Sequence, residues 1–270
     1  MHNTRDDLAS GPVPGVKEPV DPEAMARRDQ QKGLPKRFFK EAVATVDRDL
    51  FALMLDGRKA LTPARNPLAV PTSRLAQAIA DEWSAQVEYI DPAHMPLTRI
   101  VNSALDGVAR EMDATAAEIV KYAGSDLLCY RAEDPEALVE EQVKAWDPVL
   151  EWIATAHGAR FRLAGGIVFE RQPMDAIMNF RQAVENLVDA GAEGSRPLRL
   201  AGLHVMTTLT GSAILALAVA TGHLSAADAW RAAHVDEDFQ ARLWGEDGEA
   251  KARRERRWRD MAAAALVLQG

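Results

Sequence analysis

Apolar residues are spaced differently before and after Thr72. Residues 37–62 contain short apolar runs of the kind found in strands, and residues 50–55 (LFALML) form the most compact of them. Asp56-Gly57 then supplies a turn, because glycine tolerates the positive φ that tight turns need. We therefore predict a hairpin in which residues 58–62 return beside the apolar run. Three prolines, at positions 63, 67 and 71, follow this hairpin. They favour loops or edge strands in the segment between the hairpin and Thr72.

From Thr72 onward the apolar residues recur with the helical period of about 3.6. Thr72 or Ser73 is placed to cap the first helix. The apolar face of this helix carries Leu75, Ile79, Trp83 and Val87. Further helices are predicted at residues 97–108, 114–123, 135–158, 174–190, 196–221, 225–243 and 250–268. Pro148 should kink or split the helix that contains it, and residues 159–170 are predicted to make a β-excursion.

This order of elements predicts an α+β fold. A small β-rich N-terminal domain with one helix is expected at residues 37–95, followed by a larger α-helical C-terminal bundle at residues 96–270. Residues 1–36 hold five of the 14 prolines, no aromatic residue, and equal numbers of acids and bases. Because so little apolar mass is available to offset the entropy of ordering, we expect a disordered tail there, with a docking arm as the alternative.

Composition narrows the class of protein. The net charge of −8 over 270 residues argues against a general nucleic-acid binder. The single cysteine, Cys129, excludes an intramolecular disulfide and a multi-cysteine zinc site. The most apolar stretch, residues 212–220, is far shorter than the roughly 20 residues of a membrane span, and the N-terminus has no signal-peptide core. We expect a cytoplasmic protein without membrane insertion.

A search for catalytic or metal-binding motifs finds none. The six histidines show no zinc spacing, and no phosphate-binding loop, dinucleotide fingerprint or nucleophile elbow occurs. Cys129, within LLCYR, is predicted to be a buried core residue. We therefore predict no catalytic residue, no metal and no cofactor. An enzyme whose active site is assembled from distant residues remains the alternative, because such a site leaves no local spacing.

The acidic cluster Asp236, Glu237 and Asp238 is the most informative polar feature. Successive helical residues point about 100° apart, so these carboxylates do not converge on one metal ion. Residues 236–249 contain six acids and one base, with Phe239 and Trp244 among them. Acids beside aromatic anchors are typical of a partner surface. A solvated helix face, with Glu237 near Arg242, explains the same pattern.

The basic run that follows has the opposite charge. Residues 251–259 (KARRERRWR) contain six bases and one acid. A nucleic-acid-associated adaptor would use such a run, but the preceding acids cancel it and no aromatic ladder accompanies it. A salt-bridged, solvated terminal helix is the favoured interpretation. Trp83, beside Glu82, and Trp146, before Asp147-Pro148, are predicted to be structural.

Eight phrases occur together in an order that resembles a known family. They are RFFK (37–40), DGR with TP (56–58 and 62–63), NPLAVPT (66–72), LAQAIADEW (75–83), MPLT (95–98), YAGSDLLCYR (122–131), WDPVLEW (146–152) and DEDFQARLWG (236–245). From residue 37 to the C-terminus the chain resembles the assembly chaperones of mitochondria and alphaproteobacteria that attend the α subunit of the F-type ATP synthase.

The resemblance implies a function without enzymatic activity or cofactor. Such chaperones hold the free α subunit, cover the surface that later pairs with β, and leave when β arrives. The family fold is a β-rich N-terminal domain joined to an α-helical domain. We expect the free protein to be a monomer.

The resemblance also assigns roles to individual residues. The family's sensitive tryptophan falls on Trp83, for which we expect a role in folding. Its key acid falls on Asp236, with Glu237 and Asp238 beside it. Mitochondrial members usually have glutamate at this position, so the essential contact is open between Asp236 and Glu237. Residues 246–257 (EDGEAKARRERR) resemble the bacterial members, which favours the cytoplasm over the mitochondrial matrix.

Overall fold

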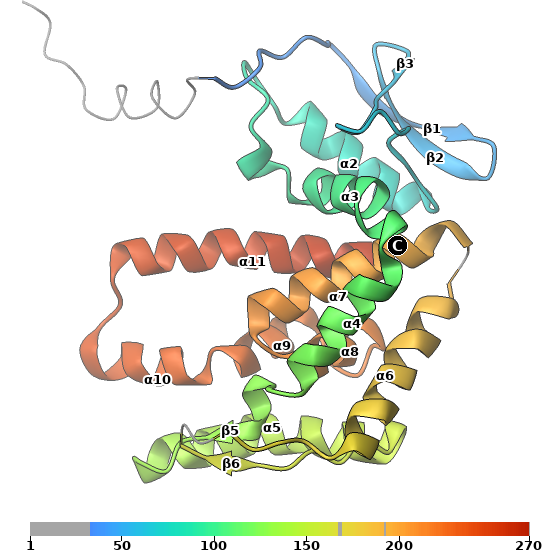
Figure 1. The fold of residues 1–270 in the computed structure, drawn as a ribbon. Coiled ribbons are helices and arrows are strands. Elements are labelled where there is room, and N and C mark those ends of the chain that lie inside the picture. The colour runs from blue at the N-terminus through green and yellow to red at the C-terminus, as the bar shows by residue number, and fades with distance from the viewer. Residues whose placement is uncertain (1–32, 167–168, 192, 270) are drawn as a thin grey trace, which may run out of the picture.

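The computed structural model describes residues 33–166, 169–191 and 193–269 (Figure 1). The tail predicted at residues 1–36 therefore lies outside the described residues except for its last four. These four are already attached to the fold, since Ile90 donates its N–H to the carbonyl of Pro35 at 2.9 Å and Lys36 bridges to Tyr89.

A small antiparallel sheet forms the N-terminal part. Strand β1 (Ala42–Asp47) pairs with β2 (Leu50–Leu55), and β3 (Arg58–Lys59) and β4 (Ala69–Val70) both pair with the other edge of β2. The predicted hairpin at Asp56-Gly57 is confirmed, with Leu55 opposite Arg58 and Gly57 at φ 76°. The returning strand is shorter than expected, since β3 has only two residues.

Helix α2 (Ser73–Ser84) packs against this sheet. The hydroxyl of Thr72 accepts the N–H of Leu75, which confirms the predicted cap. The prediction that Val87 extends the apolar face was wrong, because the helix ends at Ser84 and Val87 is 86% exposed. The guanidinium of Arg37 donates to the carbonyls of Ser84 and Gln86 and so replaces the helical bonds that would have continued the turn.

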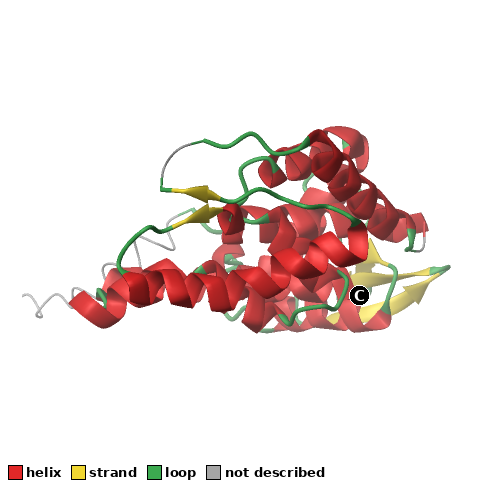
Figure 2. Ribbon diagram, turned by 90° about the horizontal axis from the view of Figure 1, so that it is seen from below, coloured by secondary structure: helices red, strands yellow, loops and turns green. Residues whose placement is uncertain are grey.

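The remainder of the chain is mainly helical. Its helices are α3 (Pro96–Asp106), α4 (Met112–Ala123), α5 (Glu136–His157), α6 (Met174–Asp189), α7 (Arg196–Thr210), α8 (Ala213–Ala220), α9 (Ala226–Ala233), α10 (Val235–Trp244) and α11 (Gly248–Gln269), with 3₁₀ turns at Pro92–His94, Val108–Arg110, Leu127–Cys129 and Glu193–Ser195. Two short parallel strands, β5 (Tyr130–Arg131) and β6 (Ala164–Gly165), lie apart from the sheet (Figure 2). The predicted α+β fold is confirmed.

The elements form three tiers in Figure 1, with the sheet, α2 and α3 at the top, α7 and α11 in the middle, and α5 with β5 and β6 at the bottom. Helix α8 is buried from Ala213 to Val219 and packs on α7, α5, α4, α9 and α11. Within the described part of the chain no helix is long and apolar enough to cross a membrane.

Two helix predictions were wrong in detail. The helix predicted at residues 196–221 breaks at Gly211, which has φ 68°, and Ser212 caps the new helix by accepting the N–H of Leu215 at 3.0 Å. The helix predicted at residues 225–243 breaks at His234, between α9 and α10. Pro148, expected to kink or split its helix, does not split it, since α5 runs unbroken from Glu136 to His157. The side chains of Trp146 and Val149 on either side of it are buried.

Candidate partner-binding site

All five predicted partner-binding residues lie on α10, but they point in different directions. Asp236 faces α5, where one carboxylate oxygen accepts the side-chain N–H of Gln142 at 2.7 Å. Gln142 is buried, and its own carbonyl accepts the N–H of Ala132 at 2.8 Å. Asp236 is therefore half-buried and already engaged inside the protein.

Asp238 faces the opposite side and forms an ion pair with Arg254 of α11. The hydrogen bond that Arg254 donates to the Asp238 carboxylate raises the pKa of the Arg254 guanidinium above its ordinary value. This pair joins the acidic stretch to the basic run, as expected for a salt-bridged terminal helix. Because the Asp238 carboxylate is already paired with Arg254, it is less available to a partner protein.

Glu237 and Trp244 are the predicted residues that remain open. Glu237 is exposed and makes no hydrogen bond or ion pair with another residue of the described ranges. Trp244, the last residue of α10, is 78% exposed. Phe239 is half-buried, with the guanidinium of Arg242 5.5 Å from its ring centroid. Arg242 does not pair with Glu237, because its partner is Glu141 of α5, with N–O distances of 2.5 and 2.6 Å.

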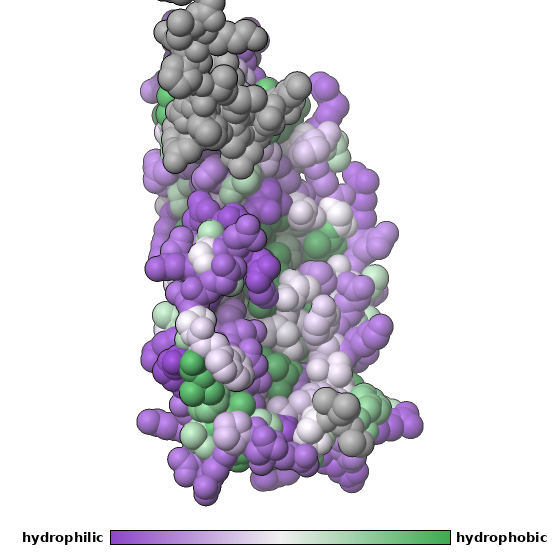
Figure 3. Space-filling view, turned by 90° about the vertical axis from the view of Figure 1, so that its left-hand side faces the viewer, coloured by the Kyte–Doolittle hydropathy of each residue, from purple (hydrophilic) through white to green (hydrophobic). Residues whose placement is uncertain are grey.

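A groove of about 350 Å³ runs between α10 and α11. Glu237 and Trp244 line it, together with the arginines 253, 254 and 257 and His234, whereas Asp236, Asp238 and Phe239 do not. One acid, Glu237, lies on the α10 wall, the connection to α11 adds Glu246 and Asp247, and the three arginines lie on the α11 wall. Figure 3 views the molecule from the side at which the α10–α11 hairpin ends, and this face is mainly hydrophilic.

His234 is a residue of the groove that the sequence did not reveal. It is buried, its Nδ1–H donates to the carbonyl of Trp230 at 2.7 Å, and burial lowers its pKa. The ring also packs on the Trp230 ring at a centroid distance of 4.0 Å. His234 lies where α9 ends and α10 begins. The apolar periodicity of residues 225–243 did not indicate this break, so it did not single out His234.

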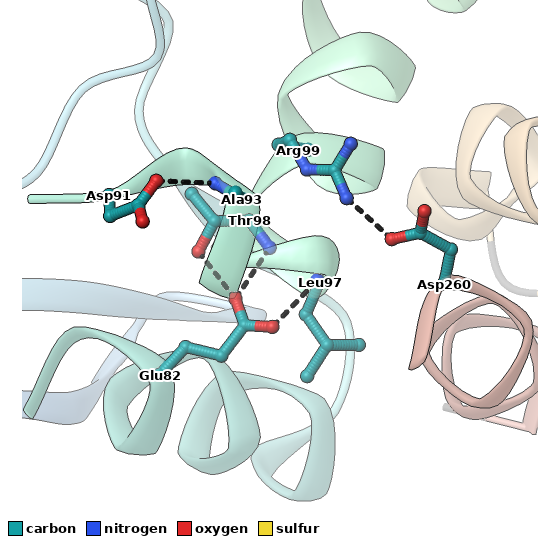
Figure 4. Close-up of polar contacts among 7 residues, drawn as sticks. All are labelled: Glu82, Asp91, Ala93, Leu97, Thr98, Arg99 and Asp260. Atoms are coloured by element: carbon teal, nitrogen blue, oxygen red, sulfur yellow. Dashed lines mark hydrogen bonds and ion pairs between the residues drawn. The ribbon is translucent and has the colours of Figure 1, made fainter. Parts of the chain in front are cut away.

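Glu82 and Trp83 lie far from this groove, at the junction between α2 and α3, and Figure 4 shows the contacts of Glu82 there. The Glu82 carboxylate accepts the N–H of Leu97 at 2.7 Å and both the N–H and the hydroxyl of Thr98 at 2.9 Å. It thereby satisfies the free amides at the start of α3. Burial is the largest influence on Glu82 and raises its pKa, although these hydrogen bonds oppose the change.

Trp83 completes the same junction. Its indole N–H donates to the hydroxyl of Thr98 at 3.1 Å, and its ring packs against Phe39 at a centroid distance of 5.5 Å. Helix α3 is in turn tied to α11 by the ion pair of Arg99 with Asp260 at 2.5 Å (Figure 4). These contacts agree with a structural role for Trp83, which remains a prediction.

Two further residues singled out from the sequence are buried. Trp146 is fully enclosed and donates its indole N–H to the carbonyl of Ala232 at 2.7 Å. Burial raises the pKa of the Cys129 thiol to about 12, so the nucleophilic thiolate is scarce at neutral pH. In the ranges that the structure covers, no three histidine, cysteine, aspartate or glutamate side chains are grouped so as to hold a metal ion.

Comparisons with known proteins give consistent results. A sequence model of the ATP12 chaperone protein family matches residues 36–154. The mitochondrial protein atp12 of Schizosaccharomyces pombe is 22% identical over 222 residues, which cover 78% of this chain and 74% of that protein. Two crystal structures from bacteria resemble the whole fold more closely.

The first is Atp12 from Paracoccus denitrificans, which is 40% identical with a TM-score of 0.76 and covers 87% of this chain and 97% of its own. The second is a protein from Agrobacterium tumefaciens that is proposed to be a chaperone. It is 46% identical with a TM-score of 0.81, and the match covers 93% of this chain and 92% of that one.

Proposed function

Because the chain belongs to the ATP12 chaperone family, which serves ATP synthase assembly, we propose that it binds the free α subunit of the F-type catalytic head. In this proposal it keeps the α subunit from aggregating until β arrives. The bacterial relatives are 40% and 46% identical and the mitochondrial one 22%, which supports action in a bacterial cytoplasm.

The open side of α10 is the observation that supports a partner site. Glu237 makes no hydrogen bond or ion pair among the described residues and Trp244 is 78% exposed, although both lie on a well-formed helix. An exposed tryptophan beside an unpaired carboxylate is typical of an interface anchor. Between the two candidate acids, the geometry favours Glu237 for the contact with α, because Asp236 is bound to Gln142.

A chaperone that must cover its client and later release it is better served by a polar binding site than by an apolar one. A free subunit exposes the apolar surface made for its neighbour, and such surfaces aggregate. The chaperone must cover that surface and still be displaced by β, so a wet and polar contact serves better than a large dry one. Acidic side chains on α10 would attract basic side chains of α and raise the rate of encounter.

Charge reversal on α10 tests this proposal. Asp236→Lys combined with Glu237→Lys should abolish binding of the purified α subunit, while circular dichroism remains native. A matched control, Glu249→Lys with Glu255→Lys, makes the same change in net charge at two exposed positions of α11 and should leave binding intact. Unchanged binding by the α10 variant would contradict the assigned site. Failure of the unmodified chain to co-purify with α from its own cytoplasm would contradict the function.

A further inference from the structure

A second cavity, of about 470 Å³, lies on the N-terminal sheet, far from α10. It opens between the β2–β3 hairpin and the segment before β1. Its floor is apolar and buried, and is formed mainly by Phe39 and Leu55. Two apolar side chains at the wall stay open to solvent, with Phe38 70% exposed and Leu61 47% exposed. A cavity of this size accommodates one or two side chains of a partner.

The framework that displays Phe38 is held by many hydrogen bonds. The Arg37 guanidinium donates to the carbonyls of Phe39, Lys40 and Gln86, and it lies 4.5 Å from the Phe39 ring centroid. On the opposite side, the Asp56 carboxylate accepts the N–H groups of Lys40 and Glu41 at 2.8 to 3.1 Å. A preorganised wall of this kind loses little entropy when a partner binds.

Two bases and one acid line the cavity: Arg58, Lys59 and Asp56. Most of the lining comes from residues 33–75, which contain eight bases and four acids, whereas the whole chain has a net charge of −8. Arg58 is exposed and has no ion-pair partner among the described residues, while Lys59 pairs with Asp47 at 2.5 Å. The backbone amides of Glu41 and Lys40 hold the pKa of Asp56 below its ordinary value, so that carboxylate is charged and already engaged.

We propose that this cavity is a second client-binding site, which takes an aromatic or aliphatic side chain from an acidic segment of the α subunit. The inference rests on the proposed function for its partner. Charge complementarity selects the acidic segment, since Arg58 is the unpaired charge at the mouth.

Two contacts of opposite charge follow from this arrangement. Strand β3, whose residues line the cavity, lies at the top of Figure 1 and α10 lies at the bottom left, so one client would be held at two separated points. Two weak contacts on one molecule bind more tightly together than either alone, because the second forms at high effective concentration. They can also be displaced one after the other, which suits release to β.

A double substitution tests the cavity without disturbing the core. Phe38→Ser with Arg58→Glu removes the exposed aromatic wall and reverses the unpaired charge. The matched control is Val46→Ser with Arg48→Glu, an exposed apolar residue and an exposed base on the same sheet but outside the cavity. With purified α subunit as the probe, the cavity variant should weaken binding by about tenfold or more and the control by less than about twofold.

The outcomes separate this inference from the proposed function. If the α10 variant loses binding and the cavity variant keeps it, the cavity inference fails and the function stands. If the unmodified chain does not bind α, both fail. If the cavity variant alone weakens binding, the inference is supported.

A photo-crosslinking residue at position 61, with one at position 46 as control, identifies the occupant. A crosslink from position 61 to an acidic segment of α supports the inference. A crosslink to residues 1–32 of this chain, or to a second copy of the chain, overturns it.

Discussion

Two regions of the molecule contain a glutamate near a tryptophan, and they use them in opposite ways. At the α2–α3 junction, Glu82 accepts three hydrogen bonds and the Trp83 N–H is bound to Thr98. On α10, Glu237 has no hydrogen-bond partner within the described ranges and Trp244 is 78% exposed. The residue types are the same in both regions.

The difference shows that hydrogen-bond partners within the protein, rather than residue types, distinguish a structural glutamate–tryptophan pair from one that is a candidate for binding another protein. At the junction the Glu82 carboxylate and the Trp83 indole N–H are satisfied internally, so these polar groups offer little to a client, although the Trp83 side chain also lines the cavity on the N-terminal sheet. On α10 the Glu237 carboxylate and the Trp244 side chain make no such bond among the described residues, so both are open to a partner. The comparison makes distinct predictions for stability and for binding at each site.

Replacement of the two tryptophans should give the largest contrast. Trp83→Arg removes the packing on Phe39 and brings a charge into the junction, so we expect a loss of about 3 kcal/mol in unfolding free energy and a lower soluble yield. Trp244→Arg, at an exposed position, should change stability by less than about 0.5 kcal/mol. Chemical unfolding of both variants measures this. A Trp83→Arg variant that folds normally and fails to bind α would show that Trp83 is a binding residue.

Asp126 is a third carboxylate to compare with Glu82 and Glu237, and it is completely buried. Asp126 has no exposed surface and accepts the N–H groups of Leu128 and Ile214 at 3.1 Å each. Burial nevertheless raises its pKa from 3.8 to about 6. Since the folded-state pKa is the higher one, folding favours the protonated acid. The resulting stabilisation is complete below the unfolded pKa and is lost as the pH rises through about 6.

This linkage predicts a pH-dependent difference between the unmodified chain and Asp126→Asn. The unfolding free energy of the unmodified chain, relative to that of the variant, should fall by about 2 kcal/mol between about pH 4 and about pH 8. Urea unfolding across this range provides the measurement. Because asparagine does not titrate, other carboxylates cancel in the difference. A difference that does not vary with pH would refute the raised pKa.

The smallest expected effect separates the two neighbouring acids of α10. Asp236→Lys leaves the buried N–H of Gln142 without its acceptor, which should cost about 1–3 kcal/mol. Glu237→Lys has no such bond to lose and should change stability by less than about 0.5 kcal/mol while weakening α binding. Thermal unfolding beside a binding assay distinguishes them. Equal loss of stability in both variants would show that Glu237 also has an internal role.

Local chemistry explains why much of the fold was predictable from sequence. The turn at Asp56-Gly57, the cap at Thr72 and the helices α3 and α4 depend on residues close together in the chain. Their signals are a glycine with positive φ, a hydroxyl that accepts a nearby N–H, and apolar residues at helical spacing.

The errors lie where packing overrides those signals. Helix α8 is apolar on all sides and buried on all sides, so it has no periodicity to mark where it begins. The break before it depends on Ser212 and on Asp126, which is 86 residues away from Ser212 and accepts the N–H of Ile214. A sequence pattern does not show such a partner.

The sequence by itself determined the α+β class, the family and the acidic stretch on α10, because these depend on residue order and on local charge. Only the tertiary structure decided which of the three consecutive acids makes no hydrogen bond or ion pair among the described residues. Consecutive residues on a helix face different neighbours, and those neighbours, Gln142 and Arg254, come from distant segments. It also brought Phe38, Arg58 and Trp83 around one cavity, since contacts between segments tens of residues apart exist only after the chain has packed.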